Sequence, residues 1–228
     1  MAGIIDNTPA TRRDLKLFSE TFATTAGKMA ADFIRGAEEK GVATSLKHFA
    51  GNSQETKRFT SDSVIDERTL REIYLTAFEI AVKEGRPETV MCAYNKINGI
   101  HCSDNERLLT DILRKEWGHQ GIVVTDWGAM NDRIEGFKAG CDLSMPGGSD
   151  YMEDDVAKAV RSGALAEEII DENVDRMIEL ILQSAARLQK DATFDLEAHH
   201  EMAREAAREG IVLLKNKNHI LPLQEGTK

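Results

Sequence analysis

The stretch that decides the fold is Gly121-Ile122-Val123-Val124-Thr125-Asp126-Trp127-Gly128-Ala129. Its apolar first half reads as a short buried strand, and the chain turns polar at Asp126, before a helix that we expect from about Met130 to Ala139. Strands of parallel sheets are covered on both faces and therefore read as continuous apolar runs. The stretch thus predicts one strand-helix unit of a parallel sheet, with a carboxylate at the carboxyl end of the strand.

Strand and helix signals alternate on both sides of this stretch. Expected strands lie at residues 42–49, 89–94, 121–125 and 141–145, and expected helices at 24–40, 66–84, 105–116, 130–139, 151–162, 167–188 and 194–210. Gly41 follows the first helix as a stop signal, and Ile211–Leu214 reads as a later strand. The repetition predicts an α/β fold with a parallel sheet. About four strand-helix units are present, whereas a closed eight-stranded (β/α) barrel needs roughly 250 residues, so we expect part of a barrel.

Composition limits the class of partner. The chain has 228 residues, of which 41% are hydrophobic, and its formal net charge is -10. A nucleic-acid-binding protein needs a surplus of Lys and Arg, so a neutral small molecule is the better candidate. No apolar stretch approaches the roughly 20 residues of a membrane helix, and Met1–Arg13 is too polar for the core of a secretory signal. These features favour a cytoplasmic protein without a membrane partner.

Cysteine and histidine usage gives no sign of a metal centre. Cys92, Cys102 and Cys141 are an odd number without C-x-x-C spacing, which implies neither a disulfide framework nor a zinc site. We expect them to be small buried residues. The adjacent pair His199-His200 would point about 100° apart on a helix and needs other ligands to close a site. The sequence therefore predicts no metal and no cofactor.

Polar side chains follow the expected strands, where catalytic residues of parallel α/β proteins lie. They are Lys47 with His48, Tyr94 with Asn95, Asp126 with Trp127, and Asp142. Cationic, hydrogen-bonding, carboxylate and aromatic groups on one rim are what a sugar pocket requires. Asp126 directly follows an apolar strand, where neighbouring donors can hold its pKa low and make it a nucleophile at an anomeric carbon.

Each of these residues also has a purely structural interpretation. Asp126 can cap the next helix through the backbone of residues 128–129. Lys47 can be a solvated cation at a strand end, and His48 a histidine satisfied within the core. The loop Asn52–Arg58 is, by composition alone, an ordinary charged turn.

Four motifs occur together and in order, and they carry a family resemblance. They are K-H-F-A-G-N-S-Q-E from Lys47, V-M-C-A-Y-N-K-I-N-G from Val90, G-I-V-V-T-D-W-G-A from Gly121 and A-G-C-D-L-S-M-P-G from Ala139. From about Arg13 to Pro222 the sequence resembles glycoside hydrolase family three. The resemblance implies a retaining β-glucosidase that hydrolyses terminal non-reducing β-D-glucosyl residues, with a β-glucoside or oligosaccharide as substrate.

The resemblance also implies a role for each matching position. Asp126 matches the nucleophile, and Trp127 matches the aromatic wall beside the aglycone site. The implied sugar-binding residues are Lys47, His48, Met91, Tyr94 and Arg13. Arg13 belongs to a segment, R-R-D-L-K-L-F-S-E, that lacks the Gly, Asn and acidic residue of the family's G-R-N-F-E-Y-F-S-E.

The resemblance further implies how the chain is divided. Residues 1–190 are similar to about the C-terminal half of the family's TIM barrel, and residues 191–228 to the linker into its α/β sandwich domain. The family's general acid/base comes from that second domain. We therefore expect the remaining barrel half and the second domain, or self-association, as macromolecular partners. The isolated chain is expected to have little or no activity.

Three alternatives stay open at this point. Family members that act as β-N-acetylhexosaminidases resemble K-H-F-P-G-H, which Gly51-Asn52 does not match. The other two are a non-catalytic sugar-binding or assembly subunit and a truncated fragment without a stable fold. The sequence does not separate these two from each other. The glycoside and its linkage also stay open, because aglycone contacts come largely from the second domain.

Overall fold

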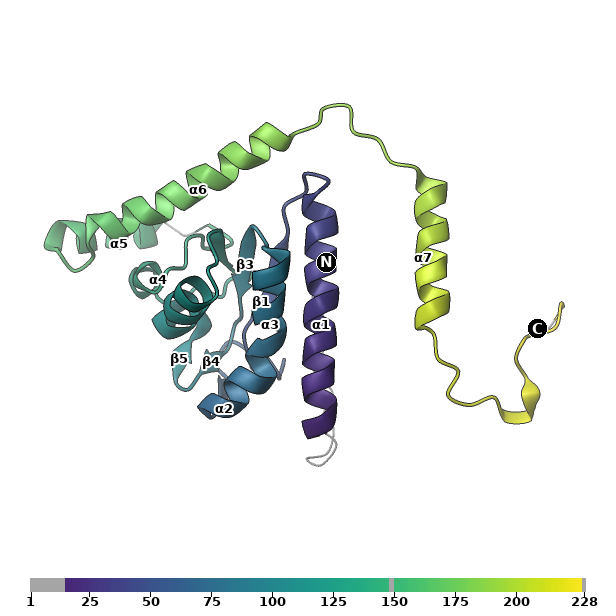
Figure 1. Ribbon diagram of the computed structural model, residues 1–228. Coiled ribbons are helices and arrows are strands. Elements are labelled where there is room, and N and C mark those ends of the chain that lie inside the picture. Colours follow the sequence, from purple (N-terminus) through teal and green to yellow (C-terminus); the bar gives the residue numbers. More distant parts are fainter. Residues whose placement is uncertain (1–14, 148–149, 227–228) are drawn as a thin grey trace. The chain divides into compact units, whose positions relative to one another are not determined.

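The structure is a computed structural model that describes residues 15–147 and 150–226 (Figure 1). By its internal contacts the chain divides into two units, Met1–Leu188 and Gln189–Lys228. The first unit is an α/β structure built on parallel strands. No described helix carries an apolar stretch of membrane-spanning length.

The central sheet contains three parallel strands in the order β1 (Ser45–Phe49), β3 (Thr89–Cys92) and β6 (Ile122–Thr125). The fourth expected strand, at residues 141–145, is reduced to a single parallel bridge between Val124 and Leu143. Its ladder stops early because the Met145 N–H donates to the Thr125 hydroxyl at 2.8 Å instead of to a backbone carbonyl. The predicted parallel order is confirmed, but the last strand is shorter than predicted.

Helices follow the strands close to the expected limits. α1 (Leu15–Glu38) begins earlier than predicted, and residues 67–85 form α2 (Glu67–Thr69), η1 (Leu70–Leu75), α3 (Thr76–Ile80) and η2 (Ala81–Gly85), which mix α and π turns. η4 (Arg107–Glu116) is a π-helix, followed by α4 (Arg133–Ala139), α5 (Asp150–Ser162) and α6 (Glu167–Arg187). α4 starts at Arg133 because the Asp132 side chain accepts the N–H groups of Ile134 and Glu135.

A small second sheet was not predicted. It consists of β2 (Asp62–Ser63), β4 (Lys96–Ile97) and β5 (Ile100–His101), followed by η3 (Cys102–Asp104). β4 and β5 form a hairpin whose turn residues, Asn98 and Gly99, have φ values of 52° and 89°. Asn-Gly is the preferred pair for such a turn, so the signal was present in the sequence.

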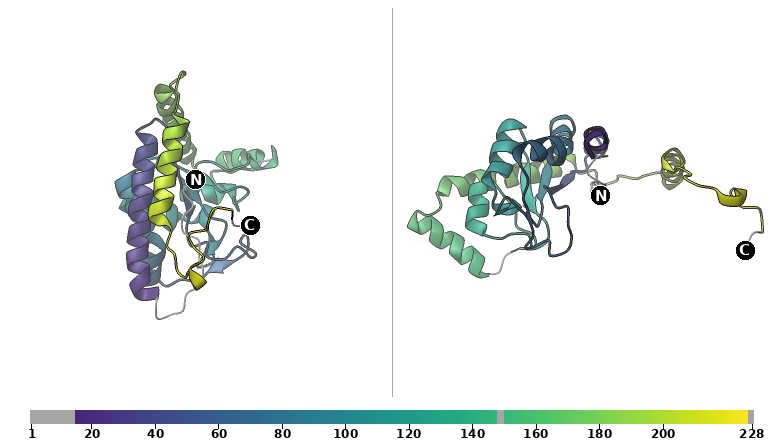
Figure 2. Two further views of the ribbon diagram at one scale, coloured as in Figure 1. Left: turned by 90° about the vertical axis from the view of Figure 1, so that its right-hand side faces the viewer. Right: turned by 90° about the horizontal axis from the view of Figure 1, so that it is seen from below.

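The core lies between the sheet and its helices. α1 lies against α3 and η2 (Figure 1, Figure 2), and Gly27 makes this approach possible, since an added Cβ would lie 2.8 Å from the Ile80 side chain. The ring of Phe49 contacts Phe78 and Trp117 edge-on. Cys92, Cys102 and Cys141 are buried free thiols, as expected of small core residues.

The second unit holds α7 (Leu196–Gly210) and the short 3-10 turn η5 (Lys217–His219). Asp195 caps α7 by accepting the Ala198 N–H. The strand predicted at Ile211–Leu214 is wrong, because these residues form no regular element. A strand needs a partner to satisfy its backbone, and the described residues of this unit contain no other strand.

Candidate active site

Asp126 stands at the carboxyl end of β6 and has donors on both carboxylate oxygens. Its Oδ1 accepts from the Tyr94 hydroxyl at 2.9 Å and from the Trp127 N–H at 2.6 Å. Its Oδ2 lies 3.0 Å from Nε2 of His48. The side chain stays 16% exposed, so a ligand can still reach it. Donors of this kind hold a carboxylate in one orientation.

His48 and Lys47 come from β1, the strand next to β3. Burial lowers the pKa of His48, while the nearby Asp126 carboxylate raises it and Lys47 lowers it. The imidazole is therefore predominantly neutral at pH 7. Because a carboxylate only accepts hydrogen bonds, the nitrogen facing Asp126 must carry the hydrogen. Both side chains are half-buried, and both residues lie in the carboxyl-terminal half of β1.

Tyr94 follows β3 and is held between two groups of the loop 52–61. The guanidinium carbon of Arg58 lies 4.0 Å from the centre of the Tyr94 ring, and Phe59 packs edge-on with its centroid at 4.5 Å. The Tyr94 hydroxyl also donates to the Trp127 carbonyl at 3.0 Å. Burial, and then the bond to Asp126, raises the pKa of Tyr94. The phenol thus remains a donor at neutral pH.

The other sequence-predicted residues have different standings. The Trp127 side chain is 63% exposed and presents its ring to solvent. Met91 lies on β3 opposite Val124 and is half-buried. Asn95 is buried and structural, since its amide donates to the carbonyls of Ala50 and Gly51. Arg13 lies outside the described residues.

The structural interpretations can now be compared with the geometry. Asp126 does not cap α4, which Asp132 caps instead. The loop 52–58 is more than a charged turn, because Arg58 reaches Tyr94 and also bonds Glu55 at 2.8 Å. Sequence reasoning missed Arg58. Nothing in the local pattern distinguishes it from a solvated cation, since its partner Tyr94 lies 36 residues away (94 minus 58).

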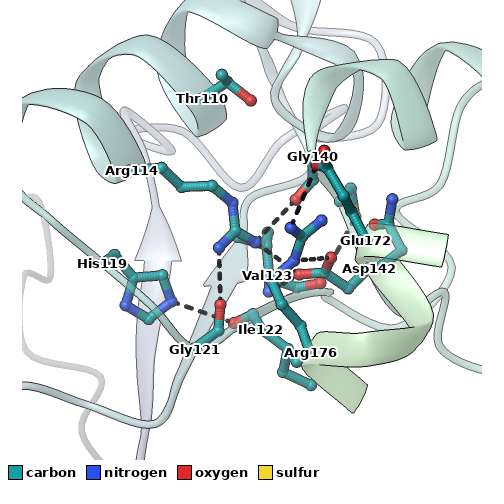
Figure 3. Close-up of polar contacts among 12 residues, drawn as sticks. Thr110, Arg114, His119, Gly121, Ile122, Val123, Gly140, Asp142, Glu172 and Arg176 are labelled. Carbon is teal, nitrogen blue, oxygen red and sulfur yellow. Dashed lines mark hydrogen bonds and ion pairs between the residues drawn. The ribbon is translucent and has the colours of Figure 1, made fainter. Parts of the chain in front are cut away.

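The structure corrects the predicted position of Asp142. Its carboxylate accepts the N–H of Val123, at the amino end of β6, at 2.6 Å, and contacts Arg114 and Arg176 (Figure 3). The sequence placed it at a strand end beside Asp126. The strand at residues 141–145 only begins there, so Asp142 lies at the opposite end of the sheet. Its side chain is fully buried and takes no part in the candidate site.

Comparison with known proteins identifies the family to which the chain belongs. The N-terminal domain of glycosyl hydrolase family 3 matches residues 3–180. The chain is 47% identical over 221 residues to thermostable beta-glucosidase B of Acetivibrio thermocellus, covering 97% of this chain and 29% of that protein. It is 48% identical over 202 residues to an exo-alpha-(1->6)-L-arabinopyranosidase of Bifidobacterium longum, covering 88% of this chain and 26% of that protein.

A solved structure shows the same relation in three dimensions. Beta-glucosidase 3B of Thermotoga neapolitana in complex with glucose matches with a TM-score of 0.81 and 43% identity, over 89% of this chain and 30% of that one. The chain thus spans less than a third of the length of these relatives. The family match, the relatives and the fold agree, and the chain belongs to glycoside hydrolase family 3, in the region of its N-terminal domain.

Proposed function

We propose that this chain supplies the nucleophile and part of the sugar-binding surface of a retaining β-glucosidase. The observation that carries the proposal is the environment of Asp126. One carboxylate stands at the carboxyl rim with donors on both oxygens, and it remains open to solvent on one side. A rigid, oriented and accessible carboxylate is the group that a retaining mechanism uses for attack.

In the proposed reaction an oxygen of Asp126 attacks the anomeric carbon of a bound glucoside. The glycosidic bond breaks, and the leaving oxygen takes its electron pair and a proton. Water then attacks the anomeric carbon of the glycosyl ester and releases the sugar with Asp126 restored. Tyr94 and the Trp127 N–H hold Oδ1 in place throughout. This leaves Oδ2, beside His48, as the oxygen that forms the bond.

The proton for the leaving group needs a second carboxyl about 5 Å from the nucleophile. Asp126 and Glu55 are the carboxylates among the groups that influence the pKa of His48. Glu55 is already engaged, because its two oxygens accept from Asn52 and Arg58. We propose that the acid comes from a segment beyond these residues, in keeping with the greater length of the relatives.

The sugar is proposed to be a β-linked glucopyranoside. A relative of the same fold was solved with glucose, and the exposed Trp127 ring offers an apolar face of the kind on which sugar rings stack. The neutral donors Tyr94 and His48 suit an uncharged polyol. The identity of the glycone is part of the proposal because another relative is an arabinopyranosidase. Glucopyranose and arabinopyranose are both pyranoses.

We also propose that the first unit is an open part of a (β/α) barrel. In the described residues β1 pairs only with β3, and Leu143 bridges only to Val124. Two helices of this unit also carry exposed apolar side chains: Phe22, Met29 and Phe33 on α1, and Ile178, Ile181 and Leu182 on α6. Unpaired edges and apolar faces promote association. Sedimentation of the pure chain should show oligomers, and a monodisperse monomer would count against an open barrel.

Covalent trapping tests the catalytic proposal. A 2,4-dinitrophenyl 2-deoxy-2-fluoro-β-glucoside does not need leaving-group protonation, and it should leave a fluoroglucosyl ester on Asp126 that mass spectrometry of the peptides locates. Asp126→Asn should abolish labelling. Asp132→Asn is the matched control, because asparagine also caps a helix and the site is intact. Labelling of another carboxylate, or none at saturating reagent, would contradict the proposal.

A further inference from the structure

The carboxylate of Asp142 has three donors from three segments of the fold. Oδ2 accepts the Val123 N–H at 2.6 Å and Nη2 of Arg114 at 2.7 Å, while Oδ1 accepts Nε of Arg176 at 2.8 Å. The side chain is fully buried, and the two arginines are mostly buried. Figure 3 shows both guanidinium groups turned toward this one carboxylate. A buried carboxylate that accepts several charged bonds is held rigidly.

The same cluster fixes the start of β6 from several sides. Arg114, on η4, also donates to the Gly121 carbonyl at 2.8 Å and to the Gly140 carbonyl at 3.2 Å. The carbonyl of Val123 accepts the N–H groups of Asp142 and Leu143 at 2.8 and 3.1 Å. Both polar backbone groups of Val123 therefore bond to residues 142–143. These bonds add to the ladder with β3 in fixing the start of β6.

Asp126 follows Val123 by three residues, directly after the end of β6 at Thr125, which is a distance of about 10 Å at a rise of about 3.3 Å per residue. An extended strand transmits an axial shift along its length. At the far end, Asp126 makes contacts of 2.6 to 3.0 Å with Trp127, Tyr94 and His48. Contacts of that length weaken when one partner moves by a few tenths of an ångström.

We propose that Asp142 is a positioning residue for Asp126, because its bonds to Val123, Arg114 and Arg176 set how far β6 reaches toward the carboxyl rim. Asp142→Asn tests the charge with little change of shape. The amide oxygen of the asparagine can still accept from the donors on one side of the carboxylate. Its NH₂ group, on the other side, then faces a guanidinium group that also donates. If the NH₂ group faces Arg176, the ion-pair partner left to this guanidinium among the described residues is Glu172, at 3.8 Å and exposed. The start of β6 should then shift.

The titration of His48 reports the position of Asp126 without any need for activity. The groups acting on His48 are Asp126, Lys47, Glu55 and Arg58, and Asp126 raises its pKa. Moving Asp126 away must lower the pKa of His48. NMR titration of the full chain, with the resonance assigned by His48→Gln, measures this pKa, and Asp126→Asn gives the reference for complete loss of the interaction.

We expect Asp142→Asn to lower the pKa of His48 by at least about half of the shift in Asp126→Asn. Glu172→Gln removes the exposed carboxylate beside Arg176 and should leave His48 unchanged. If Asp142→Asn does not fold, Arg176→Gln is read in its place and should shift His48 in the same direction. A folded Asp142→Asn or Arg176→Gln with a lower melting temperature but an unchanged His48 pKa would overturn the proposal.

The catalytic meaning of this role rests on Asp126 being the proposed nucleophile. The two claims fail separately. A His48 shift in Asp142→Asn without covalent trapping on Asp126 would leave the positioning role standing and remove the nucleophile. Trapping on Asp126 at equal rates in wild type and Asp142→Asn, with an unchanged pKa of His48, would leave Asp126 as the nucleophile and remove the positioning role of Asp142.

Discussion

Asp126 and Asp142 are carboxylates at opposite ends of the same parallel sheet, and their surroundings differ. Asp142 is fully buried, and its donors include two arginines and a backbone N–H. Asp126 is 16% exposed, and its donors are a phenol, an imidazole and a backbone N–H. Two positively charged side chains pair with Asp142, whereas uncharged donors orient Asp126, the proposed nucleophile. The residue type and the expected place at a strand end do not separate the two; their hydrogen-bond partners do.

The largest effect should come from removing the rim carboxylate. The wild-type chain should show negligible turnover of cellobiose and at most a trace with 2,4-dinitrophenyl β-glucoside. Asp126→Ala should lower that trace by about 10³-fold or more, or about 4 kcal/mol of barrier. Azide should restore part of the rate by taking the place of the carboxylate. Normal cellobiose hydrolysis, or full activity in Asp126→Ala, would contradict the comparison.

The next effect concerns stability at the other end of the sheet. Asp142→Ala leaves two buried arginines without their carboxylate, which should lower the free energy of unfolding by about 3 to 5 kcal/mol. Asp126→Ala should lower the free energy of unfolding by about 1 kcal/mol or less, because its partners are uncharged and the carboxylate is partly exposed. Urea denaturation measures both, and Glu172→Ala is the exposed control on Arg176. Equal costs for the two aspartates would remove the proposed difference.

Part of the carboxyl rim could be predicted from the sequence. The apolar run before Asp126 predicted β6, and the polar residues after β1, β3 and β6 predicted that Lys47, Tyr94 and Asp126 would share one rim. The contacts of Tyr94 and His48 with Asp126 agree with this prediction, since the length of an apolar run bounded by turns distinguishes a strand from a helix. Their chemical roles remain proposals.

Other features depend on contacts distant in sequence. Asp142 was placed on the wrong rim because the ladder at residues 141–145 begins at Asp142 and stops when Thr125 takes the Met145 N–H. The strand expected at Ile211–Leu214 does not form. Strand pairing depends on a partner distant in sequence, and the apolar pattern of these residues does not indicate one. Arg58 was missed for the same reason, since only the folded chain places it over Tyr94.

Acid should act on the amino end of the sheet before it acts on the rim. Burial, with Arg114 adding to it, lowers the pKa of His119 to about 4 from an ordinary value near 6.5. Between these two pH values, the unfolded chain therefore binds a proton on His119 that the folded chain does not bind. This contribution is complete above pH 6.5, declines by about 1.4 kcal/mol per unit as pH falls, and levels off below pH 4 after a loss of about 3 kcal/mol.

Urea titrations of wild type and His119→Gln between pH 4 and 7 measure this contribution. The variant should be less stable at pH 7 but should lose less stability on acidification. Parallel pH dependences for the two proteins would show that the imidazole is hydrated in the folded state.

The smallest effect should come from the hydroxyl that joins the rim carboxylate to its strand neighbour. Tyr94→Phe keeps the ring against Arg58 and Phe59 and removes the bonds to Asp126 and the Trp127 carbonyl. One hydrogen bond of this kind contributes about 1 kcal/mol, so trapping on Asp126 should slow about fivefold while the fold persists. The raised pKa of Tyr94 keeps the phenol protonated at neutral pH, so the ratio of the two rates should be constant from pH 5 to 8. Tyr74→Phe, a partly buried tyrosine packed against the core, is the control and should trap at the wild-type rate. A loss as large as that of Asp126→Ala would mean that Tyr94 takes part in bond making, and no loss would mean that His48 and Trp127 alone hold the carboxylate.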